Sequence, residues 1–283
     1  MVVALVVGQH GQAAAQEDDV HAGVIAGQRH AHRTRSSAGD PARTLKLLWR
    51  ETGRTDNRRG PRQGLSVERV VAAAIGIADT DGLGAVTMRQ VATVLGVVPM
   101  SLYTYVPGKA ELLDLMLDTV YGQMPRGDVS DLPWRDRLSV VAQENRELFD
   151  RHPWVADVAT NRPPLGPGLM AKYEHELRAF DGLGLADVDM DAALTFLLGF
   201  VQASARSATE AAQGQQDSAL SEEQWWAANA PLLARVFDAD AYPTAARVGS
   251  AAGASYGAAY SPDHAYRFGL RRVLDGLAAI IDK

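Results

Sequence analysis

The stretch TMRQVATVLGVVPMSLYTYVPGK, residues 87–109, decides the fold. Its first part has the spacing of a short helix with one apolar face, formed by Met88, Val91, Ala92 and Leu95. We expect Thr87 to cap this helix and Gly96 to end it in the left-handed conformation. A second short helix is expected from about Val98 to Tyr105. Two short helices joined by a three-residue turn form a helix-turn-helix, whose second helix enters the major groove of DNA.

The segment from Leu65 to about Tyr121 resembles the DNA-binding domain of the tetracycline-repressor (TetR) family. The resemblance rests on the patterns T-x-R-x-V-A-x-x-L-G and L-Y-x-Y-V-x-x-K, here carried by Thr87, Arg89, Val91, Ala92, Leu95, Gly96, Leu102, Tyr103, Tyr105, Val106 and Lys109. It covers about sixty residues, and beyond them only the order of helices is similar. The resemblance implies a cytoplasmic, homodimeric regulator that binds a palindromic operator and, by family default, represses transcription until a small molecule releases it.

By the same resemblance, Pro99, Met100 and Ser101 fall where the family contacts bases, and Arg89 falls where the preceding helix reaches a guanine. A guanidinium matches the O6/N7 pair of guanine, which makes Arg89 the main candidate for direct readout. The alternative is an arginine that binds only phosphate. Pro99 and Met100 have no hydrogen-bonding side chains, so they can contact thymine methyl groups.

Further candidates for DNA contact carry hydroxyl or ammonium groups, which donate to phosphate oxygens without reading sequence: Thr87, Tyr103, Thr104, Tyr105 and Lys109. Lys109 also begins a helix, whose free N–H groups favour an anion. For Tyr105 the alternative is a ring buried in the core of the small domain.

Composition limits the other classes of protein. The chain has 283 residues, of which 47% are hydrophobic, enough for about two domains with sizeable cores. It contains no cysteine, which excludes a disulfide framework and a cysteine zinc site. No run approaches the roughly 18 uncharged apolar residues of a membrane span, and residues 1–8 do not form a convincing secretory signal. No cofactor and no membrane contact are expected.

Charge is divided unevenly along the chain. Residues 1–122 carry 13 basic and 12 acidic side chains, whereas residues 123–283 carry 15 and 22. Within the first half, residues 29–62 carry 10 basic and 3 acidic side chains. We expect residues 1–64 to be a disordered, basic extension that contains one helical turn or two at Pro41 to Trp49. Its basic part is either an arm along DNA or a solvated linker.

The remaining chain shows helical patterns only, so the predicted class is all-α. Residues 65–122 are expected to form the DNA-binding domain and residues 123–283 a helical ligand-binding and dimerisation domain. Expected helices there cover residues 134–150, 154–160, 167–181, 189–213, 221–238 and 262–282. The Ala/Gly-rich residues 242–261 are expected to be a loop.

Two expectations concern the second domain. Apolar stripes on residues 189–213 and 262–282 resemble the helices that form the family's four-helix dimer interface; the alternative is a core pair within one chain. Tyr173, His175, Phe196 and Phe200 are the candidate ligand-binding residues, because aromatic side chains with a few polar neighbours line small-molecule sites.

Other functions have weaker support. Residues 253–257 match G-x-S-x-G, the nucleophile elbow of α/β-hydrolases, but that motif requires a strand before it and a helix after it. His30 and His32 could be a metal pair, although an accidental pair is the simpler interpretation. No catalytic or metal residue is therefore predicted. A constitutive DNA-binding or architectural protein controlled by a protein partner remains the alternative to a ligand-responsive regulator.

Overall fold

The computed structural model describes residues 36–50, 64–158 and 162–282, and these contain helices and no strands. The expected all-α class is confirmed. The helices are α1 (Pro41–Leu48), α2 (Val67–Asp81), α3 (Met88–Leu95), α4 (Pro99–Leu102), α5 (Lys109–Gly122), α6 (Trp134–Arg151), α7 (Pro153–Asp157), α8 (Pro167–Arg178), α9 (Asp187–Ser218), α10 (Glu222–Val236), α11 (Pro243–Tyr256) and α12 (Pro262–Ile281), with a 3₁₀ turn η1 (Leu83–Ala85).

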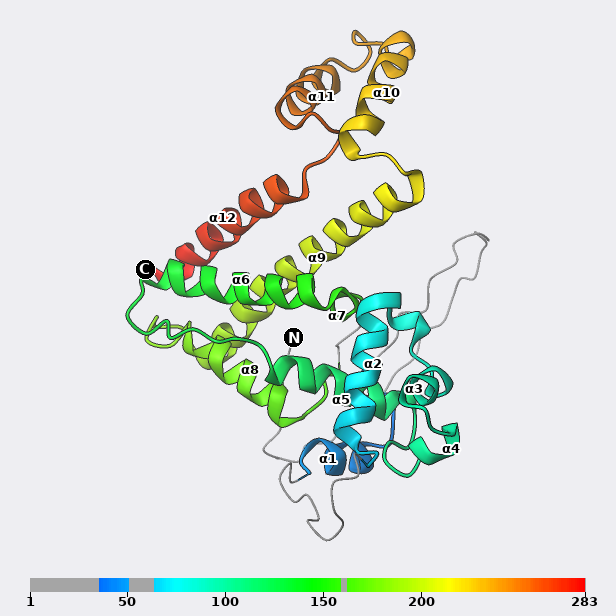
Figure 1. Ribbon diagram of the computed structural model, residues 1–283. Helices are drawn as coiled ribbons and strands as arrows, with labels where there is room; N and C mark the ends of the chain where they lie inside the picture. Colours follow the sequence, from blue (N-terminus) through cyan, green and yellow to red (C-terminus); the bar gives the residue numbers. More distant parts are fainter. Residues whose placement is uncertain (1–35, 51–63, 159–161, 283) are drawn as a thin grey trace, which may run out of the picture.

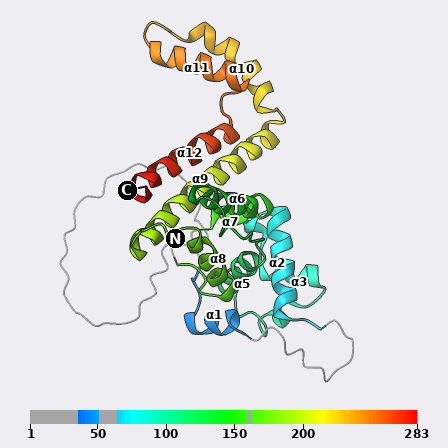
Figure 2. The ribbon, with the colours of Figure 1, turned by 90° about the vertical axis from the view of Figure 1, so that its left-hand side faces the viewer.

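The helices form three groups (Figure 1). The first comprises α1–α4 and packs around α5. The second comprises α6–α9 and α12, with α12 and α6 packed against α9. The third, α10 and α11, stands away from the rest at the far ends of α9 and α12, as the view turned by 90° also shows (Figure 2).

Helix α5 connects the first two groups and is enclosed by them. Ten of its 14 residues are buried, so it packs on almost every side rather than along one stripe. Its partner α8 crosses it closely at Gly168, where a Cβ would lie 1.9 Å from the carbonyl oxygen of Asp118. Asp118 in turn accepts a 2.8 Å hydrogen bond from the Leu169 N–H at the start of α8. The connecting helix is therefore fixed to the second domain.

The hydrophobic core does not stop at the expected boundary after residue 122. One cluster contains the buried side chains of α2–α5 together with Leu148, Trp154 and Leu169 from the following helices. A second cluster fills the space between α6, α8, α9 and α12, with Phe180 fully buried. Apolar packing therefore runs across residue 122, and a domain boundary at this residue stays a prediction.

Helix α1 confirms the one or two helical turns expected at Pro41 to Trp49, but residues 36–50 are packed on the protein rather than part of a disordered extension. Asp40 caps α1 by accepting from Ala42 N–H at 2.9 Å, and Leu48 is buried in the core. The Ser37 N–H donates to Asp114 on α5 at 2.7 Å, and the Trp49 indole donates to the Leu165 carbonyl at 2.8 Å. These anchors come from distant parts of the chain, which local composition could not indicate. Residues 1–35 and 51–63, including His30, His32 and most of the basic arm, lie outside the described residues.

The expected loop at 242–261 is also wrong, because residues 243–256 form α11. Its alanines are strong helix formers, and Pro243 stands in the first turn, where its missing N–H costs nothing. Gly253 has a packing role: a Cβ there would lie 3.1 Å from the Trp226 ring of α10. Small side chains on α11 thus allow it to lie against an aromatic ring.

Candidate DNA interface and ligand pocket

The helix-turn-helix begins and ends as its sequence predicts. The Thr87 hydroxyl oxygen accepts from Gln90 N–H at 3.1 Å and caps α3. Gly96 has a φ of 67°, which is left-handed, and the following Val97 N–H bonds back to the Ala92 carbonyl at 3.0 Å. Both expected caps of α3 are confirmed. The Thr87 hydroxyl hydrogen is still available to a phosphate oxygen.

The second helix is shorter than expected: α4 is a single turn, Pro99–Leu102, rather than Val98–Tyr105. The N–H groups of Tyr105 and Val106 both donate to the Leu102 carbonyl, which ends the helix in a turn. Pro107 follows and disfavours helical geometry at Val106. Leu102 is fully buried, as its spacing predicts, and anchors α4 to the core.

Most of the candidate DNA-contact residues are exposed in the structure: Thr87, Arg89, Pro99, Met100, Tyr103, Thr104 and Lys109. Met100 has 75% of its surface exposed and Tyr103 has 44%, although neither side chain favours water. Ser101 is partly buried. Val98, at the cap of α4, is 66% exposed and was not among the expected contacts. The sequence carried a signal for Val98: like Met100, it is an apolar residue that does not share the helix face of the buried Leu102.

Tyr105 differs from the others because its ring packs against the core of the first group of helices. This agrees with the alternative interpretation of Tyr105, and only its hydroxyl end remains a candidate for phosphate. Lys109 stands at the first position of α5, whose cap, Gly108, offers no side-chain hydrogen bond to the helix. The free N–H groups of that turn and the Lys109 ammonium therefore favour an anion at the same corner.

The four candidate ligand residues do not meet in one pocket. The Tyr173 hydroxyl donates to Asp191 at 2.8 Å, a contact that with burial raises the pKa of Tyr173 to about 12. His175 lies 2.7 Å from Glu144 on the other side of α8. Phe200 stacks on Tyr266 between α9 and α12, and Phe196 is 57% exposed. Helical spacing identified aromatic residues, but not the direction in which each one points.

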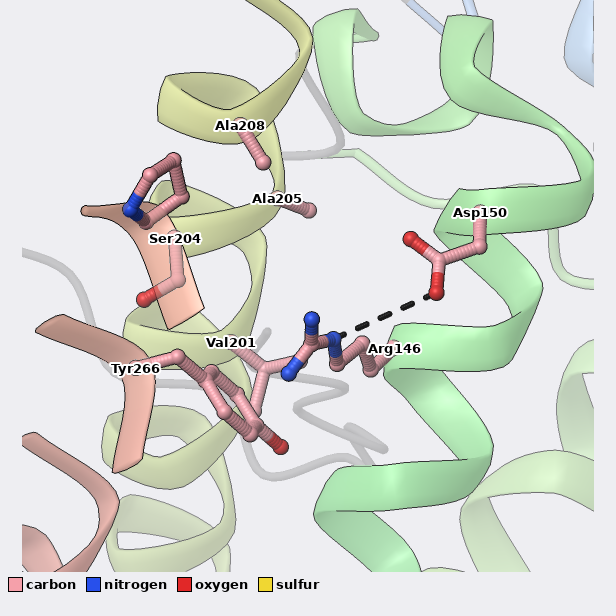
Figure 3. A pocket seen from close by; sticks show the side chains of 8 residues that line it. Arg146, Asp150, Val201, Ser204, Ala205, Ala208 and Tyr266 are labelled. Atoms are coloured by element: carbon pink, nitrogen blue, oxygen red, sulfur yellow. Dashed lines mark ion pairs between the residues drawn. The ribbon is translucent and has the colours of Figure 1, made fainter. Parts of the chain in front are cut away.

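Two adjoining cavities occur instead along α9. The smaller lies between α6, α9 and α12, where Arg146, Asp150 and Tyr266 face Ala205 and Ala208 (Figure 3). The Arg146 guanidinium lies 4.5 Å from the centre of the Tyr266 ring and pairs with Asp263. Burial raises the pKa of Tyr266; the nearby Arg146 charge opposes this shift, and the Asp150 carboxylate adds to it.

The larger cavity, which we call the junction cavity, has a volume of about 470 Å³. It shares Asp150, Ala205 and Ala208 with the smaller cavity. Its other walls come from both groups of helices: Ala78, Asp79, Gly82 and Leu83 from α2 and the turn after it, Phe149, Pro153, Trp154 and Asp157 from α6 and α7, and Thr209, Ala212, Gln213 and Gln216 from α9. Aromatic rings, small side chains and a few polar groups are the usual lining of a small-molecule site.

One carboxylate joins the two groups of helices at this cavity. Asp79 Oδ1, at the end of α2, accepts from the Trp154 indole N–H at 2.8 Å and lies 2.8 Å from His152 Nδ1. Trp154 is only 3% exposed, so its N–H has little access to water. A displacement of Trp154 in the cavity wall would therefore act directly on α2 through this hydrogen bond. Helix α2 in turn packs against α3 and α5.

The apolar stripes expected to form a dimer are largely buried inside the chain. Leu194, Leu197 and Val201 of α9 pack with Val273, Leu274 and Leu277 of α12, which agrees with the alternative of an internal core pair. The opposite faces remain open. On α9 they expose Ala192, Phe196, Gly199 and Ala203, and on α12 they expose Phe268, Gly276, Ala279 and Ile280. The exposed face of α9 is apolar at helical spacing. On α12 the Arg272 guanidinium, which pairs with Asp275, lies 5.3 Å from the centre of the exposed Phe268 ring.

The length and composition of α9 would also permit it to cross a membrane, with a mean hydropathy of 1.2. Its packing against α6, α8 and α12 is that of a bundle helix. The G-x-S-x-G residues 253–257 form the end of α11 and its cap, so they do not have the strand-turn-helix geometry of a nucleophile elbow.

Comparisons with known proteins agree with this architecture. Residues 127–281 match the family described as "Tetracyclin repressor-like, C-terminal domain". The HTH-type transcriptional repressor DrrR1 of Streptomyces coeruleorubidus is 42% identical over 249 residues, covering 87% of this chain and 88% of the relative. An HTH-type transcriptional regulator of Saccharopolyspora erythraea is 31% identical over 180 residues, covering 62% and 76%. Among solved structures, Streptomyces coelicolor ActR in complex with actinorhodin is 26% identical with a TM-score of 0.64, covering 77% of this chain and 98% of ActR.

Proposed function

The chain belongs to the TetR family of transcriptional regulators, and from this premise we propose that it is a dimeric repressor released from a palindromic operator by a small molecule. The observation that carries the proposal is the junction cavity, whose walls come from α2 of the DNA-binding head and from α9 of the second domain. An occupant of this cavity contacts both parts. The occupant can therefore change the position of the DNA-binding head relative to the second domain.

DNA is bound by the exposed residues of α3, α4 and the start of α5. Arg89 reads a guanine, while Val98, Pro99 and Met100 give thymine-methyl and shape contacts. Thr87, Tyr103, Thr104 and Lys109 hold the phosphate backbone, with the Tyr105 hydroxyl at the edge of the same surface. Ser101 completes the base-facing side of α4.

Selection from a randomised DNA library tests the DNA part of the proposal. We expect two inverted half-sites whose centres are about one helical turn apart, because a two-fold dimer presents two recognition helices at that spacing. Arg89→Ala should relax selection at one guanine in each half-site, at a cost of about 1–3 kcal/mol. Recovery of no preferred sequence, or of a single unrepeated half-site, would refute the palindromic operator.

The dimer forms through the exposed faces of α9 and α12. Gly199 and Ala203 on α9, and Gly276 and Ala279 on α12, allow the backbones of two copies to approach closely, and Phe196 and Phe268 supply the apolar area. Burying a phenylalanine in this way contributes about 1.5–3 kcal/mol.

Light scattering at micromolar concentration tests this interface. The wild-type chain should have the mass of a dimer, and Phe196→Glu should shift it to the monomer, because a carboxylate would be buried without a partner. Val94→Glu is the matched control: Val94 is 56% exposed on α3, outside the proposed interface, and this variant should stay dimeric. A wild-type monomer would refute the dimer, and a dimer that survives Phe196→Glu would refute this face.

The effector is a small molecule that occupies the junction cavity. The ActR complexes with actinorhodin and with (S)-DNPA support a small-molecule site in this fold. Here the aromatic rings of Phe149 and Trp154 offer a surface for stacking, and Thr209 and Gln213 offer hydrogen bonds. We infer a cytoplasmic location and no enzymatic role or cofactor from the same family membership.

Coupling between the two sites provides the test of release. Ala208→Trp, which fills the cavity from α9, should imitate the occupant and weaken operator binding while leaving the dimer intact. For any effector found by screening, effector must weaken operator binding by the same factor by which operator weakens effector binding. If effector and operator bind independently, the protein is instead a constitutive DNA-binding regulator.

A further inference from the structure

A third cavity lies apart from the two along α9 and shares no lining residue with them. It has a volume of about 670 Å³ and is formed by the loop at residues 126–130, the first half of α6, and the end of α8. Its lining contains three arginines and a histidine beside two aspartates: Arg126, Arg137, Arg178, His175, Asp128 and Asp181, together with Gly127, Val129 and Ser130. Basic groups thus gather at one place in a half of the chain that is strongly acidic overall.

Two of these guanidinium groups have no carboxylate partner among the described residues. Arg126 donates to the Tyr121 carbonyl at 2.6 Å, and Arg137 donates to the Asp181 carbonyl at 3.2 Å. The Nε atom of each is buried without any hydrogen-bond partner. Leaving a buried donor without an acceptor is costly, so an added acceptor at this place would be stabilising. Both arginines therefore retain donors and a full charge for a ligand.

The nearby carboxylates are occupied by other donors. Glu144 accepts from the Gly127 N–H at 2.9 Å through one oxygen and lies 2.7 Å from His175 Nε2 through the other. Asp128 accepts from the Ser130 N–H and hydroxyl, contacts that lower its pKa. Asp181 accepts from the Gly182 N–H at 3.0 Å. None of these acids neutralises Arg126 or Arg137.

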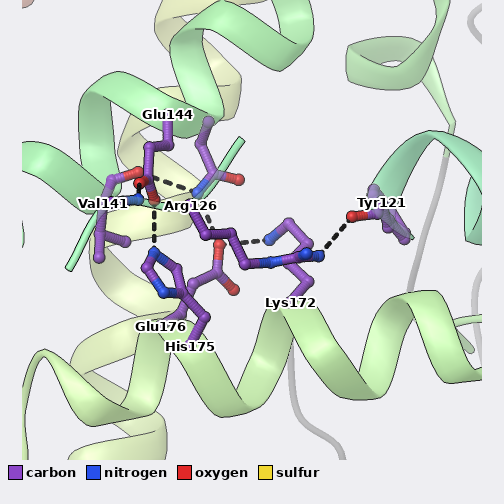
Figure 4. Close-up of polar contacts among 9 residues, drawn as sticks. Tyr121, Arg126, Val141, Glu144, Lys172, His175 and Glu176 are labelled. Carbon is purple, nitrogen blue, oxygen red and sulfur yellow. Dashed lines mark hydrogen bonds and ion pairs between the residues drawn. The ribbon is translucent and has the colours of Figure 1, made fainter. Parts of the chain in front are cut away.

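A buried polar network joins α6 and α8 next to the cavity residues Arg126 and His175 (Figure 4). Glu176 on α8 accepts from Lys172 Nζ at 2.5 Å and from Asn145 Nδ2 of α6 at 2.6 Å. The side chains of Lys172 and Glu176 are only 5% and 2% exposed. Asn145 also donates to the Val141 carbonyl at 3.0 Å. This network fixes α6 against α8, the two helices that carry the cavity residues Arg137 and Arg178.

We propose that this cavity is a binding site for a small anion that carries a carboxylate or phosphate group, with Arg126 and Arg137 as its principal ligands and Arg178 and His175 at its rim. The planar fork of a guanidinium matches either group through two parallel N–H···O bonds. The site is separate from the junction cavity, since the two share no lining residue. It is nevertheless connected to the DNA-binding head, because Arg126 holds the last turn of α5 through the Tyr121 carbonyl.

Isothermal titration calorimetry of the full chain in a phosphate-free buffer of constant ionic strength tests the proposal. Pyrophosphate and citrate serve as the two probes and distinguish a phosphate site from a carboxylate site. We expect saturable binding of at least one probe with one site per chain. The substitution Arg137→Gln should weaken it at least about tenfold, because a charge-assisted pair is lost.

Arg151→Gln is the matched control, because Arg151 lies on the same helix, is exposed and stands outside the cavity. This variant should bind as the wild type does. Circular dichroism of Arg137→Gln should show the wild-type helical content, so that lost binding reports the site and not unfolding. The proposal is overturned if neither probe gives saturable heat, or if Arg137→Gln and Arg151→Gln weaken binding equally. These outcomes do not depend on operator release, which is measured separately.

Discussion

The contact between Asp79 and Trp154 gives the sharpest prediction about how the two parts of the chain are joined. Asp79→Ala removes the acceptor of a 2.8 Å hydrogen bond from an indole N–H that is almost completely buried. A hydrogen bond to a charged group contributes about 1.5–3 kcal/mol, and stranding a buried donor costs a similar amount. Because 29% of the Asp79 side chain is exposed, we take the lower part of this range and expect a loss of about 1–2 kcal/mol.

A double-mutant cycle separates this bond from the other effects of each substitution. Trp154→Phe removes the donor but keeps an aromatic ring in the core, at its own cost in packing. If the hydrogen bond carries the interaction, Asp79→Ala should cost almost nothing further in the Trp154→Phe background, apart from the remaining contact of Asp79 with His152. The expected coupling energy is about 1 kcal/mol, within the range seen for residues in contact.

Urea unfolding followed by circular dichroism measures the four free energies, at one fixed protein concentration because a dimer's stability depends on it. Asp81→Ala is the control: Asp81 is exposed in the same last turn of α2, and its loss should change the free energy of unfolding by less than about 0.5 kcal/mol. A coupling energy indistinguishable from zero would refute the reasoning. So would an unchanged operator affinity in Asp79→Ala, since this bond is argued to hold the head.

Three further predictions concern the remaining contacts. Leu48→Ala should lower the free energy of unfolding in urea by about 2–5 kcal/mol, because Leu48 is 3% exposed in the core. Leu45 is 40% exposed on the same helix, so Leu45→Ala should lower it by less than about 1 kcal/mol. Equal losses would mean that α1 does not pack as described. Burial raises the pKa of Asp114 from 3.8 to about 6, so the folded chain holds this proton more tightly than the unfolded chain does, and the resulting stability is present below about pH 4 and lost as the pH rises through 6. The free energy of unfolding of the wild type minus that of Asp114→Asn should therefore fall by about 3 kcal/mol between pH 3 and 7, and a constant difference would contradict it. Lys109→Ala should weaken binding to all DNA sequences and flatten the slope of log K against log[salt] by about one, and an unchanged slope would remove Lys109 from the phosphate contacts.

The parts of the fold that could be predicted from the sequence are those set by local rules. The cap at Thr87, the left-handed Gly96 and the burial of Leu102 depend on the conformational preferences of a few adjacent residues. The exposed positions Arg89 and Met100 follow from the same helical geometry. This explains why most of the residues expected to contact DNA are exposed, although α4 is shorter than expected and Val98 was not among them. Their contact with DNA stays a prediction.

Features that depend on distant contacts were not predictable in this way. Helix α1 is held by Asp114 and by the Leu165 carbonyl, and α11 is held against Trp226; none of these partners is near in sequence. The candidate ligand residues do not share one pocket for a related reason. Spacing shows which residues share a helix face, but the partner of that face decides whether Phe200 lines a cavity or stacks on Tyr266.

The buried helix α5 connects the DNA-binding surface to the second domain and to the anion site. At its start, Lys109 is placed for DNA; in its middle, Asp114 and Asp118 accept backbone N–H groups from the N-terminal segment and from α8; at its end, the Tyr121 carbonyl accepts from Arg126. A buried helix packed at native density cannot bend freely, so a shift at one end moves the other. The close contact between Gly168 and the Asp118 carbonyl restricts α5 further, because α8 has no space to slide past Asp118. Ligands that act on the head must therefore either move α5 as one body or act on α2 directly, and the two cavities correspond to these two routes.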